Sequence, residues 1–358
     1  MKRYVCILAG GRGERFWPMS TWSRPKQVLA LSSDKPMLAE AVDRVAALVP
    51  PEQVLVITNA ALVEACRSAI PQVPAENVIG EPYGRDTAAA CALAGAIVAK
   101  RSPDGVLAML TADHVMRDGA RFRAVLGASY EKALREPVIV TLGITPDFPS
   151  TGFGYIECGE GSSENGVVFR AAKRFVEKPD RETAERYVET GRYLWNGGMF
   201  IWRVQTLQAA LDRHVPVLGE MARALMPAVD TPAFAEALRN AYEPLGRISI
   251  DYAVMEKASN IVTAESAFGW MDVGTWAALE RLHEKDAQGN ILLGMAEALA
   301  STGNIVVSQD RLTALIGVED LVVVHSGDAT LICPKKRSED VKQLVQALSE
   351  RGDCDAYL

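Results

Sequence analysis

The stretch Leu8-Ala-Gly-Gly-Arg-Gly-Glu-Arg-Phe-Trp-Pro-Met-Ser-Thr-Trp-Ser-Arg-Pro-Lys26 decides the fold. It begins in an apolar run, residues 5–9, that is typical of a buried strand. Gly10, Gly11 and Gly13 permit a tight turn and let a ligand come close to the backbone. The pattern therefore predicts a first strand that leads into a ligand-binding loop.

The spacing within this loop separates three kinds of glycine-rich site. The dinucleotide fingerprint requires a third glycine where Phe16 stands, and a Walker loop requires a lysine that follows a glycine at fixed spacing, which is absent. The remaining kind wraps phosphates in backbone N–H groups, with Arg and Lys supplying charge. A flexible turn with solvent-facing arginines is the alternative interpretation of the loop alone.

The charge distribution favours an anion site in the same segment. The 358 residues carry a net charge of −7, yet residues 1–26 contain six basic side chains against the single acid Glu14. That segment therefore carries +5 and the other 332 residues carry −12. An acidic chain of this kind argues against a general nucleic-acid coat.

Apolar strand-like runs alternate with segments of helical period through the first half of the chain. The predicted strands are residues 5–9, 53–58, 106–111 and 138–143, and the predicted helices are residues 36–48, 60–70, 87–100 and 120–134. This alternation predicts an α/β fold whose mostly parallel sheet is covered on both faces.

The pattern loosens after residue 150 and changes again after residue 288. We expect a loop at 151–155, a strand at 167–177, a helix at 181–190, helices within 205–241 broken by three prolines, a strand at 261–264 and a helix at 275–285 capped by Thr275. Beyond them we expect short strands at 305–308, 312–316, 321–325 and 330–333, then a helix at 338–350. This change in the pattern of predicted helices and strands predicts a domain boundary near residue 287.

The cysteines, histidines and N-terminal residues exclude several other classes. The six cysteines and four histidines are scattered without disulfide-framework or zinc-ligand spacing, so the thiols are expected to be reduced. The apolar run at 4–9 is too short for a signal sequence or a membrane span. We therefore expect a cytoplasmic protein without a membrane or nucleic-acid partner.

The loop and its continuation resemble the signature of sugar-nucleotide pyrophosphorylases, G-x-G-x-R-[LF]-x-P followed by P-K. Seven later segments resemble, in order, motifs of the mannose-1-phosphate guanylyltransferases. They are Glu81-Pro-Tyr-Gly-Arg-Asp-Thr-Ala, Leu110-Thr-Ala-Asp-His114, Thr151-Gly-Phe-Gly-Tyr-Ile-Glu157, Phe175-Val-Glu-Lys-Pro179, Trp195-Asn-Gly-Gly-Met-Phe200, Ser249-Ile-Asp-Tyr-Ala-Val-Met-Glu-Lys257 and Gly269-Trp-Met-Asp-Val-Gly-Thr-Trp276. The resemblance covers residues 3–283.

The resemblance implies a Rossmann-like nucleotidyltransferase domain over residues 1–287, with a mostly parallel mixed sheet. A small left-handed β-helix-like domain with a terminal helix would follow over residues 288–358, as in the shorter, single-function bacterial relatives. The chain departs from the frequent pattern at Phe16, Asp86, Ala89, Thr111 and Gly197. None of these departures removes a charged group of the motifs.

The resemblance also implies the site residues. The nucleotide would be bound by Leu8, Ala9, Gly10, Gly11, Gly13, Arg15, Lys26, Arg85, Asp86 and Thr87. The sugar phosphate would be bound by Gly152, Glu177, Lys178, Asn196 and Asp251. Arg15, Lys26, Asp113, Lys178 and Asp272 would form the catalytic set.

Two aspartates stand out from the residues themselves. Asp113 ends a hydrophobic strand at the edge where open α/β sheets bind ligands, and Asp272 lies between a strand and a helix. Each position also suits a turn or helix-cap aspartate. A pair of carboxylates suits Mg²⁺, and the resemblance makes these two its ligands. For His114 we expect a neutral hydrogen-bonding role.

The implied reaction transfers GMP from GTP to α-D-mannose 1-phosphate, with GDP-mannose and pyrophosphate as products. A phosphate monoester is mostly a dianion at pH 7, so no general base is required, and the chain shows no Ser-His-Asp or Cys-His pattern. Two alternatives stay open: a pyrophosphorylase for another hexose 1-phosphate and NTP, or a catalytically silent sugar-nucleotide-binding regulatory subunit. The family further suggests a homodimer.

Overall fold

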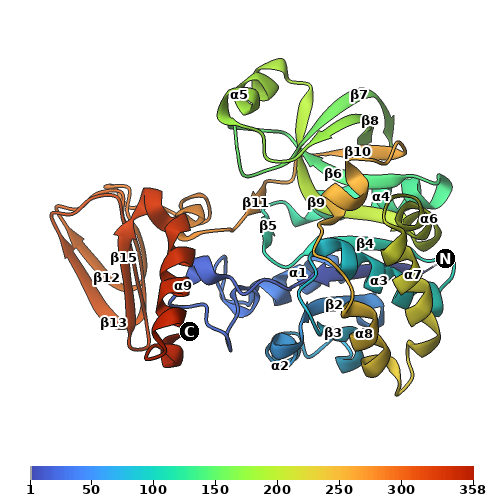
Figure 1. Cartoon of the computed structure of the whole chain (residues 1–358). Coiled ribbons are helices and arrows are strands. Elements are labelled where there is room, and N and C mark those ends of the chain that lie inside the picture. Colours follow the sequence, from blue (N-terminus) through green and yellow to red (C-terminus); the bar gives the residue numbers. More distant parts are fainter. Residues whose placement is uncertain (1) are drawn as a thin grey trace.

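A nine-stranded mixed sheet forms the centre of the computed structural model, which describes residues 2–358 (Figure 1). In spatial order its strands are β3 (Val78–Glu81), β2 (Val54–Asn59), β1 (Arg3–Leu8), β4 (Val106–Thr111), β9 (Tyr193–Arg203), β6 (Ile139–Ile144), β10 (Ile261–Ser266), β8 (Val167–Val176) and β7 (Tyr155–Glu164). β1 to β4 pair in parallel, and so do β6 and β10, whereas β9 is antiparallel to both β4 and β6. The predicted mostly parallel mixed sheet is confirmed.

Helices cover both faces of this sheet because its central strands are apolar on both sides. In β1, Val5 and Ile7 face one core, whereas Tyr4 and Cys6 face the other. The first core is covered by α1 (Met37–Val45), α2 (Val63–Ala69), α4 (Gly119–Arg135) and α5 (Arg181–Thr190). The second core is covered by α3 (Thr87–Arg101), α6 (Val204–His214), α7 (Pro216–Leu225) and α8 (Phe234–Tyr242).

The order of the strands locates the ligand-binding edge of the sheet. From β1 the chain adds β2 and β3 on one side and β4 on the other, so the strand order reverses between β1 and β4. Open α/β sheets bind ligands outside the carboxyl ends of strands at such a reversal. The glycine-rich loop after β1 and Asp113 after β4 therefore open at the same edge.

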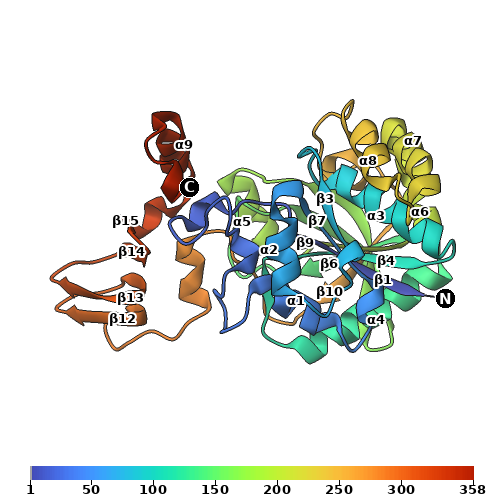
Figure 2. The ribbon, with the colours of Figure 1, turned by 90° about the horizontal axis from the view of Figure 1, so that it is seen from below.

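A separate four-stranded sheet forms the C-terminal region, to one side of the large sheet (Figures 1 and 2). Its strands are β12 (Ile291–Leu299), β13 (Ile305–Ile316), β14 (Leu321–Ser326) and β15 (Ala329–Pro334), and α9 (Val341–Arg351) follows. β12, β13 and β14 pair in parallel although only short connections join them, which is typical of a β-solenoid. Asn304 donates to Asn290 at 2.9 Å between successive coils.

Two local predictions are wrong. Residues 312–316 are not a separate strand, because they continue β13 past an irregularity in its pairing with β12. Residues 275–285 form a 3₁₀ segment, Trp276–Arg281, in place of a helix, and the Thr275 side chain does not cap it. Trp276 is fully buried, so tertiary packing decides this conformation.

Other strands were not predicted at all. The longest of them are β9 and β7, and each contains glycine, which weakens the alternation that marks a strand. In contrast, the division of residues 205–241 by prolines is confirmed, since α6, α7 and α8 occupy the intervening segments.

The six cysteines are all free, as expected. Within residues 2–358, every helix falls short of the length and apolar character needed to cross a membrane.

Candidate active site

The backbone of Ala9 anchors the glycine-rich loop where it leaves β1. Its N–H donates to the carbonyl of Ile57 at 2.8 Å. Its carbonyl accepts from the Gln27 amide at 2.5 Å and from the Thr58 hydroxyl at 2.8 Å, and both side chains are buried. The loop therefore starts from a rigid point, while Gly10 and Gly11 beyond it are exposed.

Gly13 brings the two ends of the loop together. Its φ is +71°, a value that side-chain-bearing residues rarely adopt, and a Cβ there would lie 2.3 Å from Cβ of Lys26. The 3₁₀ turn Glu14–Phe16 follows, and Arg15 within it is exposed. The pKa of Asp272 is raised by burial and by Asp113, and the charge of Arg15 partly offsets that rise. Gly13 thus allows Lys26 to lie directly beneath the segment that carries Arg15.

Lys26 is buried and links three parts of the chain. Its ammonium donates to a carboxylate oxygen of Asp113 at 2.7 Å and to the carbonyl of Val273 at 2.7 Å. Burial acts to raise the pKa of Asp113, but the charge and the hydrogen bond of the Lys26 ammonium outweigh it, and that pKa is lowered to about 2. The loop lysine and the strand-end aspartate therefore form one charged unit.

Asp113 and Asp272 are brought together by a small two-stranded sheet. β5 (His114–Met116) pairs antiparallel with β11 (Trp270–Asp272), which places Asp272 opposite His114. The N–H of Val273 donates to the backbone carbonyl of Asp113 at 3.3 Å. Burial and then the negative charge of Asp113 raise the pKa of Asp272. The two carboxylates are therefore close enough to interact electrostatically.

This pair fits a divalent cation that is also bound by substrate. Two close carboxylates repel one another, and a cation between them relieves that repulsion. Among residues 2–358 no cluster of three or more His, Cys, Asp or Glu side chains could hold a metal by itself. Mg²⁺ is usually bound by one or two carboxylates together with phosphate oxygens and water, so a two-carboxylate site suffices.

His114 is held as a neutral hydrogen-bonding residue. Its Nδ1 accepts from the indole N–H of Trp270 at 3.1 Å, and burial lowers its pKa. The second nitrogen then carries the proton and is a donor. This geometry agrees with the neutral role expected for His114.

Four of the residues assigned to the sugar phosphate form two hydrogen-bonded pairs. The Asn196 amide donates to Asp251 at 2.7 Å, and the Lys178 ammonium donates to Glu177 at 2.7 Å. Burial and the charge of Glu177 raise the pKa of Asp251 to about 6. Asp251 lies in a short π-helical turn, Asp251–Met255, that packs against α6.

A cavity of about 190 Å³ joins the sugar-side residues to Asp272, one member of the aspartate pair. Its lining includes Leu8, Thr87, His114, Gly152, Glu177, Asn196, Asp251 and Asp272. The structure thus places predicted nucleotide, sugar and metal residues around one hollow. Lys178 is not among the lining residues; its side chain is 60% exposed and is paired with Glu177, which is one of them.

The segment Arg85 to Thr87 is tied to the second half of the chain. The Arg85 guanidinium donates to the carbonyls of Tyr242 and Glu243, at 3.1 and 2.7 Å, and does not line the cavity. Asp86 caps α3 through its own side chain at a φ of +68°. The Thr87 hydroxyl accepts from the N–H of Ile250 at 2.9 Å, which positions Asp251 beside it.

Glu81 is a candidate site residue that the sequence reasoning missed. It ends β3 at the ligand-binding edge, it is buried, and a Cβ on Gly10 would lie 3.7 Å from its second carboxylate oxygen. The Tyr242 hydroxyl donates to its first oxygen at 3.1 Å. Burial raises the pKa of Glu81 to about 7. A carboxylate at the carboxyl end of a strand was the available signal.

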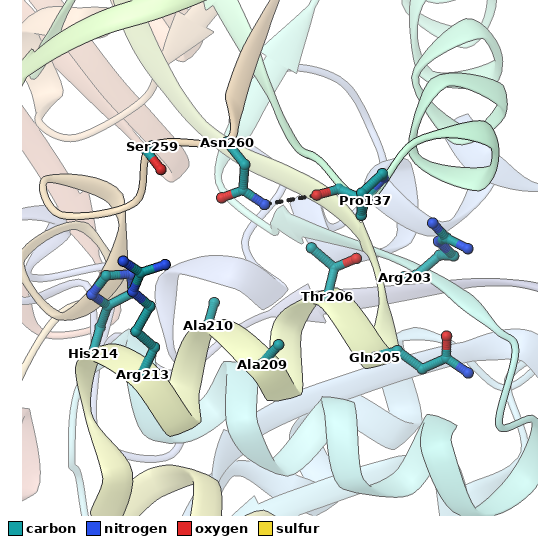
Figure 3. A pocket seen from close by; sticks show the side chains of 10 residues that line it. All are labelled: Pro137, Arg203, Gln205, Thr206, Ala209, Ala210, Arg213, His214, Ser259 and Asn260. Atoms are coloured by element: carbon teal, nitrogen blue, oxygen red, sulfur yellow. Dashed lines mark hydrogen bonds between the residues drawn. The ribbon is translucent and has the colours of Figure 1, made fainter.

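A second hollow, of about 430 Å³, lies away from these residues, along α6 (Figure 3). It is lined by Pro137, Arg203, Gln205, Thr206, Ala209, Ala210, Arg213, His214, Ser259 and Asn260. The Asn260 amide donates to the Pro137 carbonyl across it at 2.7 Å (Figure 3). It contains none of the residues predicted for the site.

Comparison with known proteins agrees with this geometry. Residues 4–289 match the nucleotidyl transferase family, and residues 297–348 match the MannoseP isomerase/GMP-like beta-helix domain. The mannose-1-phosphate guanylyltransferases of Klebsiella pneumoniae and Escherichia coli K12 are each 37% identical to the chain. These matches cover 96% and 98% of the chain and 73% and 74% of the relatives.

A solved structure extends the likeness to three dimensions. The Thermus thermophilus protein named mannose-1-phosphate geranyltransferase superposes with a TM-score of 0.87 at 37% identity. The superposition covers 98% of this chain and 100% of that one. Both the catalytic sheet and the C-terminal coils are therefore those of one known architecture. The chain belongs to the mannose-1-phosphate guanylyltransferases within the nucleotidyl transferase family.

Proposed function

We propose that this enzyme transfers GMP from GTP to α-D-mannose 1-phosphate and releases pyrophosphate. An oxygen of the sugar phosphate forms a bond to the α-phosphorus of GTP, and the bond from that phosphorus to the bridging oxygen of the β-phosphate breaks. GDP-mannose and pyrophosphate are the products. The single observation that carries the proposal is the cavity that Asp272 lines together with Glu177, Asn196 and Asp251, with Asp113 close enough to Asp272 to raise its pKa.

Positive side chains lie on either side of the reacting centre and bind different phosphate groups. Arg15 and Lys26 neutralise the triphosphate and then the departing pyrophosphate, since both belong to the loop that wraps it. Lys178 holds the attacking phosphate as a point charge. Catalysis then rests on positioning and charge stabilisation, and the dianionic sugar phosphate needs no general base.

Asp113 and Asp272 are the residues that would hold Mg²⁺. When bound, the cation supplies charge neutralisation at the phosphate oxygens. Lys26 has a second task there, because its hydrogen bond keeps the Asp113 carboxylate ionised and oriented.

The carboxylates of the cavity suit a hexose. Sugar hydroxyls donate and accept hydrogen bonds, and Glu177 and Asp251 supply acceptors that Lys178 and Asn196 hold in place. Gly154 leaves room for this arrangement, since a Cβ there would lie 2.4 Å from a Glu177 carboxylate oxygen. The neighbouring Gly152 is exposed at the mouth of the site.

Glu81 supports guanine as the base. Guanine presents two adjacent N–H donor groups on its Watson–Crick edge, whereas uracil and thymine present one. A carboxylate accepts two such donors side by side. Glu81 ends β3 beside Gly10 of the nucleotide loop, where a base stacked over the loop would meet it.

The proposal extends to organisation and location. Residues 1–287 would carry the chemistry and residues 288–358 would form a separate C-terminal domain. Six free cysteines are usual in a reducing compartment and favour the cytoplasm. A homodimer stays a prediction from the family resemblance.

A substrate panel tests the proposed function. Purified chain is mixed with each of GTP, UTP, dTTP and ATP and with mannose or glucose 1-phosphate, in Mg²⁺, and pyrophosphate release is followed. We expect release with GTP and mannose 1-phosphate above all other pairs. Release led by a different pair identifies another pyrophosphorylase, and no release with any pair identifies a silent sugar-nucleotide-binding subunit.

A further inference from the structure

The C-terminal region contacts the loop that carries Arg15. The indole N–H of Trp17 donates to the carbonyl of Tyr357 at 2.8 Å, across 340 residues of chain. The carbonyl of Trp17 accepts from the indole N–H of Trp276 at 3.1 Å. Trp17, two residues after Arg15, is therefore hydrogen-bonded both to Tyr357 and to Trp276.

Packing reinforces these hydrogen bonds. The rings of Phe16 and Trp276 meet edge to face, with centroids 4.9 Å apart, and both are fully buried. They belong to a third buried cluster, distinct from the two cores of the large sheet, that also contains Trp17 and the C-terminal residues Val341, Val345 and Leu358. Figures 1 and 2 both show α9 beside the N-terminal loop.

Other contacts hold the start of the loop at Ala9, the Arg12 carbonyl, which accepts from the Ser20 hydroxyl at 2.6 Å, and Gly13, which packs on Lys26. Gly10 and Gly11 are exposed, and a Cβ on Gly11 would meet no atom within 4 Å. Arg15 itself is exposed and lies one residue before Phe16. The aromatic pair behind Arg15 is therefore the restraint nearest to it in the chain, and that pair is packed against the C-terminal region.

We propose that Trp17 is a positioning residue, through which the C-terminal region holds Arg15 over the triphosphate site. The inference rests on the proposed function, because it takes the triphosphate as the ligand of the loop. It adds that the β-solenoid and α9 are part of the nucleotide site and not only an appended domain. Disturbing this contact should weaken binding of GTP and pyrophosphate but leave the sugar phosphate, which lies on the opposite side of the cavity, unaffected.

The test removes one hydrogen bond at a time. Trp17→Phe keeps an aromatic ring but loses the donor to Tyr357, and Trp276→Phe loses the donor to the Trp17 carbonyl. We expect each variant to raise KM for GTP, and for pyrophosphate in the reverse reaction, by about three- to tenfold, the range typical of one hydrogen bond. KM for mannose 1-phosphate should change by less than about twofold. A parallel rise for both substrates, or unchanged KM values, overturns the proposal.

A matched pair of valines separates positioning from stability. Val345 of α9 lies in the cluster with Trp17, whereas Val323 of β14 is comparably buried but lies outside it. Val345→Ala and Val323→Ala should lower Tm by similar amounts, but only Val345→Ala should raise KM for GTP. Equal effects of both on KM for GTP would assign the change to general stability and contradict the inference.

A binding measurement separates this inference from the proposed function. If the wild-type chain shows no turnover, the proposed function fails, and calorimetric titration with inorganic pyrophosphate still compares wild type with Trp17→Phe. Weaker pyrophosphate binding by the variant supports the positioning role. Equal binding, with wild type itself binding, overturns it.

Discussion

The ammonium of Lys26 lies 2.7 Å from a carboxylate oxygen of Asp113, although 87 residues separate them in the chain. The pair joins the end of the glycine-rich loop to the end of β4, across the point where the strand order reverses. Lys26 also donates to the carbonyl of Val273, directly after Asp272. The buried ammonium of Lys26 therefore connects the loop to the two segments that carry Asp113 and Asp272.

The substitution Asp113→Asn tests the metal site. The amide side chain would keep the volume of the carboxylate but lose its charge, so we expect Mg²⁺-dependent turnover to fall by about a hundredfold or more, the cost typical of losing one electrostatic contact to a transition state. The change is measured as pyrophosphate release against Mg²⁺ concentration, with circular dichroism to verify folding. Asp118→Asn, at the N-terminus of α4, is a control that removes a carboxylate elsewhere. Near-normal activity of Asp113→Asn would remove Asp113 from the metal site.

Lys178→Ala should damage the use of the sugar phosphate. The ammonium is hydrogen-bonded to Glu177, and its charge also acts on the neighbouring Asp251 in the sugar-side hollow. We expect KM for mannose 1-phosphate to rise by about tenfold or more, as is typical of losing a charged hydrogen bond, while KM for GTP changes little. The matched control is Lys173→Ala, an exposed lysine of β8. A larger effect on GTP than on the sugar phosphate would place Lys178 on the nucleotide.

Glu81→Gln should weaken the preference for GTP and change the response to pH. The ratio of kcat/KM for GTP to that for ATP is expected to fall, because an amide supplies only one acceptor oxygen. In wild type, KM for GTP should rise as pH falls below about 7, the pKa to which burial raises the Glu81 carboxyl. The variant should lose this pH dependence, and a base preference that survives the substitution would exclude Glu81 from base recognition.

The same carboxyl has a predictable effect on stability. Burial raises its pKa from 4.5 to about 7, so the folded chain retains a proton that the unfolded chain releases between these values. Stability should therefore fall as pH rises from about 4.5 to 7, by an amount on the order of 1–3 kcal/mol. Urea denaturation of wild type and Glu81→Gln across this range checks the sign, since the variant should show a flatter profile. A wild-type curve that rises more steeply than that of the variant would contradict it.

Gly13→Ala should impair both folding and catalysis. The added methyl group would lie 2.3 Å from Cβ of Lys26 at a φ of +71°, so the loop must move or strain. We expect a loss of about 1–3 kcal/mol of stability, as is typical of such strain, together with a marked loss of activity because Lys26 and Arg15 shift. Gly84→Ala, where no atom lies within 4 Å of the new methyl group, is the control for stability. Wild-type stability of Gly13→Ala would show that the loop relaxes freely.

Much of the fold could be predicted because its signals are local. The central strands are buried on both faces and form continuous apolar runs, and the prolines at 216, 227 and 232 divide the helical region where the structure does. The 3₁₀ segment Trp276–Arg281 could not be predicted in this way. Its conformation depends on Trp276 packing against Phe16 and donating to Trp17, which lies 259 residues away in the chain.

The candidate site, like the fold, was predicted where its signals are local in the sequence and was not predicted where they depend on tertiary contacts. The charge and spacing of the loop predicted an anion site, and the positions of Asp113 and Asp272 at element ends predicted a cation. The partners of Arg85 come from the tertiary structure alone, since its guanidinium donates to the carbonyls of Tyr242 and Glu243. Glu81 is a further case, because only burial beside Gly10 and Tyr242 distinguishes it from an ordinary strand-end acid.

The sequence by itself determined the α/β class, the glycine-rich loop and the types of charged group at the site, because periodicity, glycine spacing and charge are properties of neighbouring residues. Only the tertiary structure decided which of those groups meet. The ion pair of Lys26 with Asp113, the electrostatic interaction of Asp113 with Asp272, and the contact of Trp17 with Tyr357 all join segments far apart in the chain. Their geometry follows from strand order and buried packing, which no local pattern encodes.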